Sequence, residues 1–315
     1  MNNNTMKKQI RGSIMLLIAA LIWGSAFVAQ SEGMAYVEPF TFASIRFFIG
    51  AIVLLPVISF MKKKETGNGN LLSDYSKEKG IGDFISSHKL LITGSVFCGL
   101  MLTAATNFQQ QGIKYVSSVG KAGFITTLYI VLVPIFSIFI GKKVRGIIWI
   151  ALGFAVLGLY YLCVTEKLTF ELLDILLIMC AVFFALQIMV IDHYVDRVNP
   201  VALSSLQFFV VGVISAVLMF IFEKPTISGI IAATGPILYA GVLSSGVAFT
   251  LQVLAQKDLD PTLASMIMCL ESVVSVLSGF LFLGQKLSIR EGVGCILMFI
   301  GVILAQLPEK SVEAK

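Results

Sequence analysis

Long apolar stretches alternate with short polar ones along almost the whole chain. Ten of these stretches approach the ~20 residues that an α-helix needs to cross the hydrocarbon core of a membrane. A transmembrane β-barrel would instead show shorter strands of alternating polarity. We therefore predict an all-α membrane protein with ten transmembrane helices. The predicted spans are residues 12–30, 40–60, 90–109, 116–140, 146–164, 172–191, 200–222, 236–256, 261–283 and 289–306.

The amino-acid composition also indicates a protein embedded in lipid. Hydrophobic residues make up 57% of the 315 residues and charged residues only 13%, about half of the ~25% charged residues in a typical soluble domain. The formal net charge of +5 comes largely from basic clusters beside apolar segments, so it indicates membrane topology and gives no support for a nucleic-acid partner. The five cysteines lie singly in apolar segments, without the spacing of a metal site, so no cofactor is expected.

The distribution of basic residues predicts which side of the membrane each loop faces. The amino terminus carries three Lys and Arg residues, the loop 61–89 carries six, and the loop 141–145 carries three. Short loops rich in Lys and Arg stay in the cytoplasm, and an even number of spans returns the chain to its starting side. We therefore expect both termini in the cytoplasm. The charge asymmetry is weak in the second half, so this orientation depends on the first half.

The chain contains an internal repeat. A shift of 161 positions places Pro39 on Pro200, Ser44 on Ser205, Phe47 on Phe208 and Phe48 on Phe209. A shift of 143 positions places Gly141 on Gly284, Lys143 on Lys286 and Gly158 on Gly301. The difference of 18 positions fits the longer loop 61–89 of the first half. Because five spans are an odd number, the second copy enters the membrane from the opposite side, which predicts two inverted five-helix repeats, residues 1–166 and 167–315.

Inverted repeats are a recurring plan of secondary transporters, whose substrate site lies between the halves near the membrane midplane. The repeat therefore favours transport of a small molecule without ATP hydrolysis. Two alternatives remain open: a passive channel or facilitator, and a membrane subunit with a purely structural role. An intramembrane enzyme is not expected, since the chain has neither a His-Glu-x-x-His nor a Gly-x-Ser-x-Gly pattern.

Five short motifs are spread over nearly the whole chain: IWGSAF at residues 22–27, IRFF at 45–48, GKAGFIT at 120–126, LESVV at 270–274 and LFLGQKL at 281–287. Together they resemble the drug/metabolite transporter superfamily, specifically its EamA-type members with ten helices in tandem five-helix domains. The resemblance implies transport of a small metabolite such as an amino acid or a related compound. It further implies a bacterial cytoplasmic membrane, and we expect an exporter that works by alternating access.

Three charged side chains are predicted inside the membrane: Arg46, Lys121 and Glu271. A charge at the centre of a transmembrane helix costs about 2.5–3.5 kcal/mol on insertion, so such a residue normally faces a partner or a wet cavity. Two cations and one anion leave one positive charge over. We expect one cation to pair with Glu271 and the other to bind a carboxylate of the substrate, which an amino acid would supply.

Each charge has an alternative role. Lys121 can extend its side chain to the outer interface, and Arg46 can tether loop carbonyls or Glu38. Glu271 lies near the middle of its span, and burial disfavours an ionised carboxyl. We therefore expect Glu271 either to pair with a cation or to carry a coupling proton, which makes protons a candidate partner besides the substrate and the lipid bilayer.

Other polar residues recur at helical spacing within the spans. The candidates for a substrate-binding wall are Trp23, Asn107, Gln187, Gln252 and Ser275. For each of them the alternative is packing or an interhelical hydrogen bond, worth about 0.6–2 kcal/mol in a membrane. The pattern leaves the oligomeric state open.

Overall fold

The computed structural model describes residues 3–66, 88–115, 119–163, 172–283 and 288–307. Within these residues every regular element is helical, and nine helices are long and apolar enough to cross a membrane. A tenth apolar helix, Gly146–Leu162, is slightly shorter. The predicted all-α fold with ten spans is confirmed.

The helices of the first half are α1 (Asn3–Gly33), α2 (Pro39–Thr66), α5 (Lys89–Tyr115), α6 (Val119–Thr127), α7 (Tyr129–Phe139) and α8 (Gly146–Cys163). Those of the second half are α9 (Asp174–Tyr194), α10 (Pro200–Phe222), α11 (Ile227–Ala232), α12 (Thr234–Leu238), the π-helix η1 (Tyr239–Phe249), α13 (Thr250–Gln256), α14 (Pro261–Met268), α15 (Glu271–Leu283) and α16 (Ile289–Gln306). Most of the predicted loop 61–89 lies outside the described residues, and α2 extends beyond its predicted end. The short α11 was not predicted.

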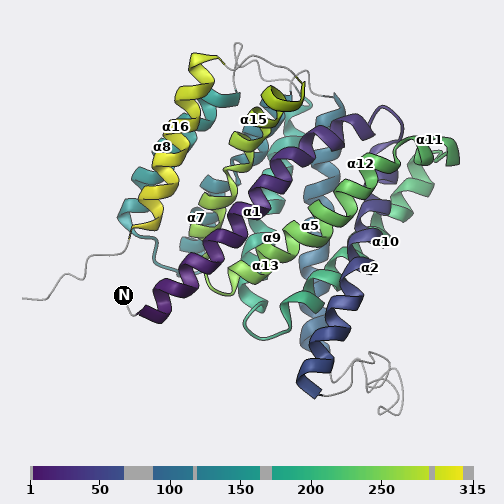
Figure 1. Cartoon of the computed structure of the whole chain (residues 1–315), viewed down its shortest axis with the longest axis horizontal. Coiled ribbons are helices and arrows are strands. Elements are labelled where there is room, and N and C mark those ends of the chain that lie inside the picture. Colours follow the sequence, from purple (N-terminus) through teal and green to yellow (C-terminus); the bar gives the residue numbers. More distant parts are fainter. Residues whose placement is uncertain (1–2, 67–87, 116–118, 164–171, 284–287, 308–315) are drawn as a thin grey trace, which may run out of the picture.

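Helices that occupy the same place in the two halves lie side by side and run antiparallel, α2 with α10 and α8 with α16 (Figure 1). The ring of Phe40 at the start of α2 lies 6.1 Å from the ring of Phe222 at the end of α10. Arg145, just before α8, donates hydrogen bonds to the carbonyls of Ala305 and Leu307 at the end of α16. Equivalent helices can run in opposite directions only when one repeat is inverted, as predicted.

The hydrogen bonds between α2 and α10 follow the shift found in the sequence. The Ser44 hydroxyl donates to the carbonyl of Gly212 at 3.2 Å, and the Ser205 hydroxyl donates to the carbonyl of Ala51 at 3.1 Å. A shift of 161 positions converts the first bond into the second. The two bonds are thus related by a pseudo-two-fold axis that passes between the halves.

Small residues bring α8 and α16 into backbone contact. A Cβ atom added to Gly158 would lie 2.7 Å from the carbonyl oxygen of Gly294, and one added to Gly301 would lie 2.7 Å from that of Ala151. The shift of 143 positions relates these two contacts. Membrane helices associate through such close packing, because lipid provides little hydrophobic drive between them.

Both described ends of the chain lie on one face of the bundle. The Gln9 side chain donates a hydrogen bond to the Gln306 carbonyl at 3.3 Å, and Arg11 forms an ion pair with Asp258 beside it. We call this the terminal face. An even number of spans requires this arrangement, and the described amino-terminal end of the chain and the end of α16 lie near each other on the left side of Figure 1.

On the opposite face, a hydrogen-bonded contact joins the second half to the first. The Glu223 carboxylate, just after α10, accepts hydrogen bonds from the backbone amides of Phe40 and Thr41 at 2.7 and 2.8 Å. It thereby caps the first turn of α2, where backbone N–H groups lack helical partners. Glu38 is free for another contact and pairs with Lys114.

The contact between α8 and α16 can be tested with Gly301→Val. The new side chain would meet the backbone of α8, and overpacking of this kind costs about 1–3 kcal/mol. We expect a clearly lower unfolding temperature in lipid nanodiscs. Gly292→Val is the matched control, since a Cβ there meets no described atom within 4 Å. Equal unfolding temperatures for the two variants would contradict the close packing.

Candidate functional site

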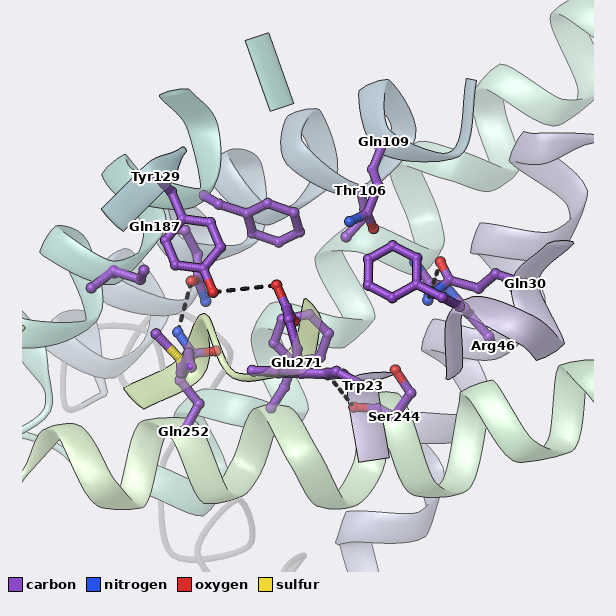
Figure 2. A pocket seen from close by; sticks show the side chains of 15 residues that line it. Trp23, Gln30, Arg46, Thr106, Gln109, Tyr129, Gln187, Ser244, Gln252 and Glu271 are labelled. Carbon is purple, nitrogen blue, oxygen red and sulfur yellow. Dashed lines mark hydrogen bonds between the residues drawn. The ribbon is translucent and has the colours of Figure 1, made fainter. Parts of the chain in front are cut away.

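A cavity lies between the two halves, with walls from both (Figure 2). The space between its walls is about 510 Å³ when the open solvent at its mouth is included. The lining residues are Trp23, Phe27, Gln30, Arg46, Thr106, Gln109, Tyr129, Phe184, Gln187, Ile188, Ser244, Phe249, Gln252, Met268 and Glu271. Apolar and aromatic walls with a few polar groups are typical of sites for small organic molecules.

The lining follows the internal repeat. The shift of 161 positions pairs Trp23 with Phe184 and Phe27 with Ile188, and the shift of 143 positions pairs Thr106 with Phe249 and Gln109 with Gln252. All eight of these residues line the cavity. The cavity therefore lies on the pseudo-two-fold axis, where an inverted-repeat transporter binds its substrate.

The two charges break this symmetry. The position equivalent to Arg46 is Gln207, and the position equivalent to Glu271 is Leu128. Duplication alone would have given each charge a counterpart. Arg46 of the first half and Glu271 of the second half therefore each lack a charged counterpart in the other half, and a charge inside a membrane bundle is a candidate functional residue.

Arg46 is 2% exposed. Its guanidinium carbon lies 4.7 Å from the ring centre of Phe47 and 5.7 Å from that of Phe42, and Nη1 donates a hydrogen bond to Gln30 Oε1 at 3.4 Å. Within the described part of the chain no carboxylate pairs with Arg46, and its Nε has no hydrogen-bond partner. Aromatic faces and one amide stabilise the charge, and donor capacity remains for an anion.

Glu271 is 6% exposed and stands in the first turn of α15. Its Oε1 accepts a hydrogen bond from the Tyr129 hydroxyl at 3.3 Å. The amino-terminal end of a helix carries partial positive charge, which favours a carboxylate at this position. Of the two cations predicted as partners of Glu271, Arg46 does not pair with it, and in Figure 2 the two side chains occupy separate parts of the cavity. The side chain of the other candidate, Lys121, lies outside the described residues.

The fourth and ninth spans are each interrupted near the cavity. The fourth span is divided into α6 and α7 around Leu128, and the ninth into α14 and α15 around Cys269 and Leu270. The unbroken apolar pattern predicts a continuous helix in both places, and this prediction is wrong. The shift of 143 positions aligns Leu128 with Glu271, so the breaks are nearly equivalent. Discontinuous helices at corresponding places of inverted repeats are a common feature of transporter sites.

The eighth span, which also contributes to the cavity wall, is irregular as well. The eighth span contains η1, a π-helix of 11 residues, and such segments are rare and frequently lie at functional sites. The Trp23 indole N–H donates to the Ser244 carbonyl of η1 at 3.3 Å, and its ring centre lies 4.8 Å from that of Phe249. Trp23 thus joins α1 to η1 across the middle of the cavity.

The structure brings together most of the residues predicted from the sequence. The predicted residues in the cavity wall are Trp23, Arg46, Gln187, Gln252 and Glu271. Asn107 lies elsewhere, where its amide donates to the Ser215 hydroxyl at 3.0 Å and it lines a separate cavity beside α5, α9 and α10. Ser275 is half-buried and outside the described lining. The side chain of Lys121 lies outside the described residues.

Several residues of the wall are not among those predicted from the sequence. Tyr129 and Ser244 were not predicted, because a tyrosine or a serine in an apolar span carries no signal of its own. Gln109 was also missed, although the internal repeat contains the necessary signal. The shift of 143 positions places Gln109 on Gln252, which was predicted.

The EamA-like transporter family matches the chain over residues 10–164 and 172–307. An uncharacterized transporter of Archaeoglobus fulgidus is 29% identical over 304 residues, which cover 95% of this chain and 87% of that protein. The uncharacterized transporter YoaV of Bacillus subtilis is 22% identical over 295 residues, covering 92% and 94% of the two chains. One protein of known crystal structure superposes with a TM-score of 0.72 at 18% identity, covering 94% of this chain and 96% of its own, and therefore has the same fold.

The role of Arg46 can be tested by its effect on stability. A buried charge without a carboxylate partner costs desolvation energy, and replacing it by an apolar residue is often neutral or stabilising. We expect Arg46→Met to keep or raise the unfolding temperature. Arg145→Met is the matched control and should lower it, because Arg145 donates to two carbonyls of another segment. A large destabilisation by Arg46→Met would support the structural tether instead.

Proposed function

Because the chain belongs to the EamA-like transporter family, we propose that it is a secondary transporter for a small organic metabolite with a carboxylate group, an amino acid or a related compound. It exports this substrate from the cytoplasm by alternating access. The terminal face is the cytoplasmic side of a bacterial cytoplasmic membrane, so both ends of the chain lie in the cytoplasm.

The observation that carries this proposal is the position of Arg46. A guanidinium presents donors in a rigid fork that matches a carboxylate. Arg46 lines the central cavity with its Nε unpaired among the described residues, and Phe42 and Phe47 fix its orientation. A substrate carboxylate supplies the missing anion at the outer end of the cavity, close to the amino-terminal end of α2.

The contacts on the two faces support alternating access. They join one half to the other, and they are ion pairs on one face and a helix cap on the opposite face. On the terminal face, Arg11 pairs with Asp258 and Lys142 pairs with Asp192. Ion pairs that remain partly exposed are worth only about 0–1 kcal/mol, so they can open without a large cost. On the opposite face, Glu223 holds the first turn of α2.

Glu271 is the candidate carrier of a coupling proton. It is a buried carboxyl near the middle of a span, it lines the same cavity as Arg46, and its partner in the described residues is a neutral tyrosine hydroxyl. Buried acidic side chains inside a membrane bundle are common members of proton pathways in transporters. Proton binding at Glu271 and substrate binding at Arg46 therefore take place in one chamber, which links the two events.

Counterflow in proteoliposomes tests the proposed function. A screen of amino acids, nucleobases, sugars and organic cations for thermal stabilisation first selects a ligand, since binding to the folded state raises its apparent stability. We expect a carboxylate compound to be selected and to show saturable counterflow. Arg46→Gln should weaken its transport by about tenfold or more, in line with the ~1.5–3 kcal/mol of a hydrogen bond to a charged group.

Arg46→Lys is the control in this assay, because it keeps the charge and loses the fork. It should retain more transport than Arg46→Gln. Flux without saturation or counterflow would instead indicate a passive channel. Selection of ligands without a carboxylate, with transport unaffected by Arg46→Gln, would contradict the substrate class.

Proton coupling is tested with Glu271→Gln, which keeps the size of the side chain and removes its titration. We expect substrate exchange at equal pH on both sides to persist, while accumulation driven by a pH gradient is lost. Tyr129→Phe removes the hydrogen bond to Glu271 but leaves the carboxyl, so it should retain gradient-driven accumulation. Accumulation by Glu271→Gln at the wild-type level would contradict the assignment of Glu271.

A further inference from the structure

Three glutamine side chains form a connected chain of amides at the end of the cavity nearer the terminal face. Gln256 Nε2 donates to the backbone carbonyl of Ile188 at 2.8 Å. Gln252 Nε2 donates to Gln256 Oε1 and to Gln187 Oε1, each at 3.1 Å. The three amides come from α9 and α13, so the chain of hydrogen bonds links two spans of the second half.

The orientation of each amide in this chain is determined by its neighbours. A backbone carbonyl can only accept, so Gln256 must present its Nε2 to Ile188 and its Oε1 to Gln252. Gln252 must then present Nε2, whose two hydrogens serve Gln256 and Gln187. Gln187 must then accept this hydrogen bond through its Oε1. The usual ambiguity between the two ends of an amide is therefore resolved by the network itself.

Two amide atoms at the end of this hydrogen-bond network have no partner. Gln187 Nε2, a donor, and Gln252 Oε1, an acceptor, have no hydrogen-bond partner among the described residues. The two side chains are 0% and 2% exposed, and both residues line the cavity. In Figure 2 they lie at one end of the cavity while Arg46 and Gln30 lie at the other. A buried donor or acceptor without a partner costs about 1–3 kcal/mol, which a ligand can recover.

We propose that Gln187 and Gln252 form a subsite for a primary carboxamide of the substrate. A carboxamide carries a donor and an acceptor on separate atoms, so it offers the oxygen that Gln187 Nε2 needs and the N–H that Gln252 Oε1 needs. A carboxylate has no donor for Gln252, and an ammonium group has no acceptor for Gln187. This inference rests on the proposed function, because it names the group that the substrate carries at the end away from its carboxylate.

The rest of the wall suits such a ligand. In Figure 2 Trp23 lies between the two polar ends. Its ring packs against Phe249, and both of these residues and Phe184 line the cavity with apolar surface for a short aliphatic chain. Both free atoms are covered in this state of the cavity. A substrate reaches them only when the walls part, which is the movement that alternating access requires.

Competition among three probes tests the subsite. L-glutamine, L-glutamate and L-norleucine have similar lengths and end in a carboxamide, a carboxylate and a methyl group. In the full-length protein in proteoliposomes, we expect L-glutamine to compete for counterflow at least about tenfold better than either of the others, because a site built for hydrogen bonds rejects analogues that leave its groups unpaired.

Gln187→Met should abolish this preference, bringing L-glutamine to within a few-fold of L-norleucine. Gln110→Met is the matched control. Gln110 is also fully buried with both amide atoms unpaired in the described structure, yet it lies outside the described cavity lining, so its replacement should leave the preference intact.

The outcomes separate this inference from the proposed function. If carboxylate compounds exchange but the wild-type protein does not prefer L-glutamine, or if Gln187→Met keeps the preference, the subsite is wrong and the transporter assignment stands. If no carboxylate compound exchanges, both fail. The wild-type profile alone decides the matter should Gln187→Met not fold.

Discussion

Antiparallel packing of equivalent helices, α2 on α10 and α8 on α16, holds together the two halves that line the central cavity. In lipid the hydrophobic effect contributes little to helix association, so close packing and interhelical hydrogen bonds must stabilise it. Ser44 and Ser205 supply such bonds on one side of the axis, and Gly158 and Gly301 allow backbone contact on the other. The wall of the cavity comes mainly from the other spans, the interrupted ones included, and Arg46 is the lining residue that α2 contributes.

Within that symmetrical frame, the site is asymmetric. Aromatic and glutamine side chains occur at equivalent positions of both halves, whereas Arg46 and Glu271 have uncharged counterparts, Gln207 and Leu128. In an alternating-access cycle the two halves exchange conformations, so a charge in one half meets a different surrounding in each state. Under the proposed cycle, an anion would bind more strongly at the end of the cavity that holds Arg46 than at the other end.

Hydrophobicity and the internal repeat were sufficient to predict the fold. The ten spans, their inversion and the shared face of the two chain ends all follow from segment length and from an odd number of spans in each repeat. The charges Arg46 and Glu271 could be placed in the cavity because charge inside a membrane is costly. The breaks in the fourth and ninth spans could not be predicted, because no glycine or proline stands at either break. The position of Asn107 outside the central cavity could not be predicted either, because the rotation of a helix about its axis decides which cavity a side chain faces.

The central claim is that the two halves move against each other and open the cavity to one side at a time. Cysteines at positions 11 and 258, whose native side chains form an ion pair across the terminal face, can be joined by a short cleavable bifunctional thiol reagent in a background without other cysteines. The account predicts that counterflow stops when this link is made and returns when it is cut. Undiminished counterflow with the link in place would contradict alternating access.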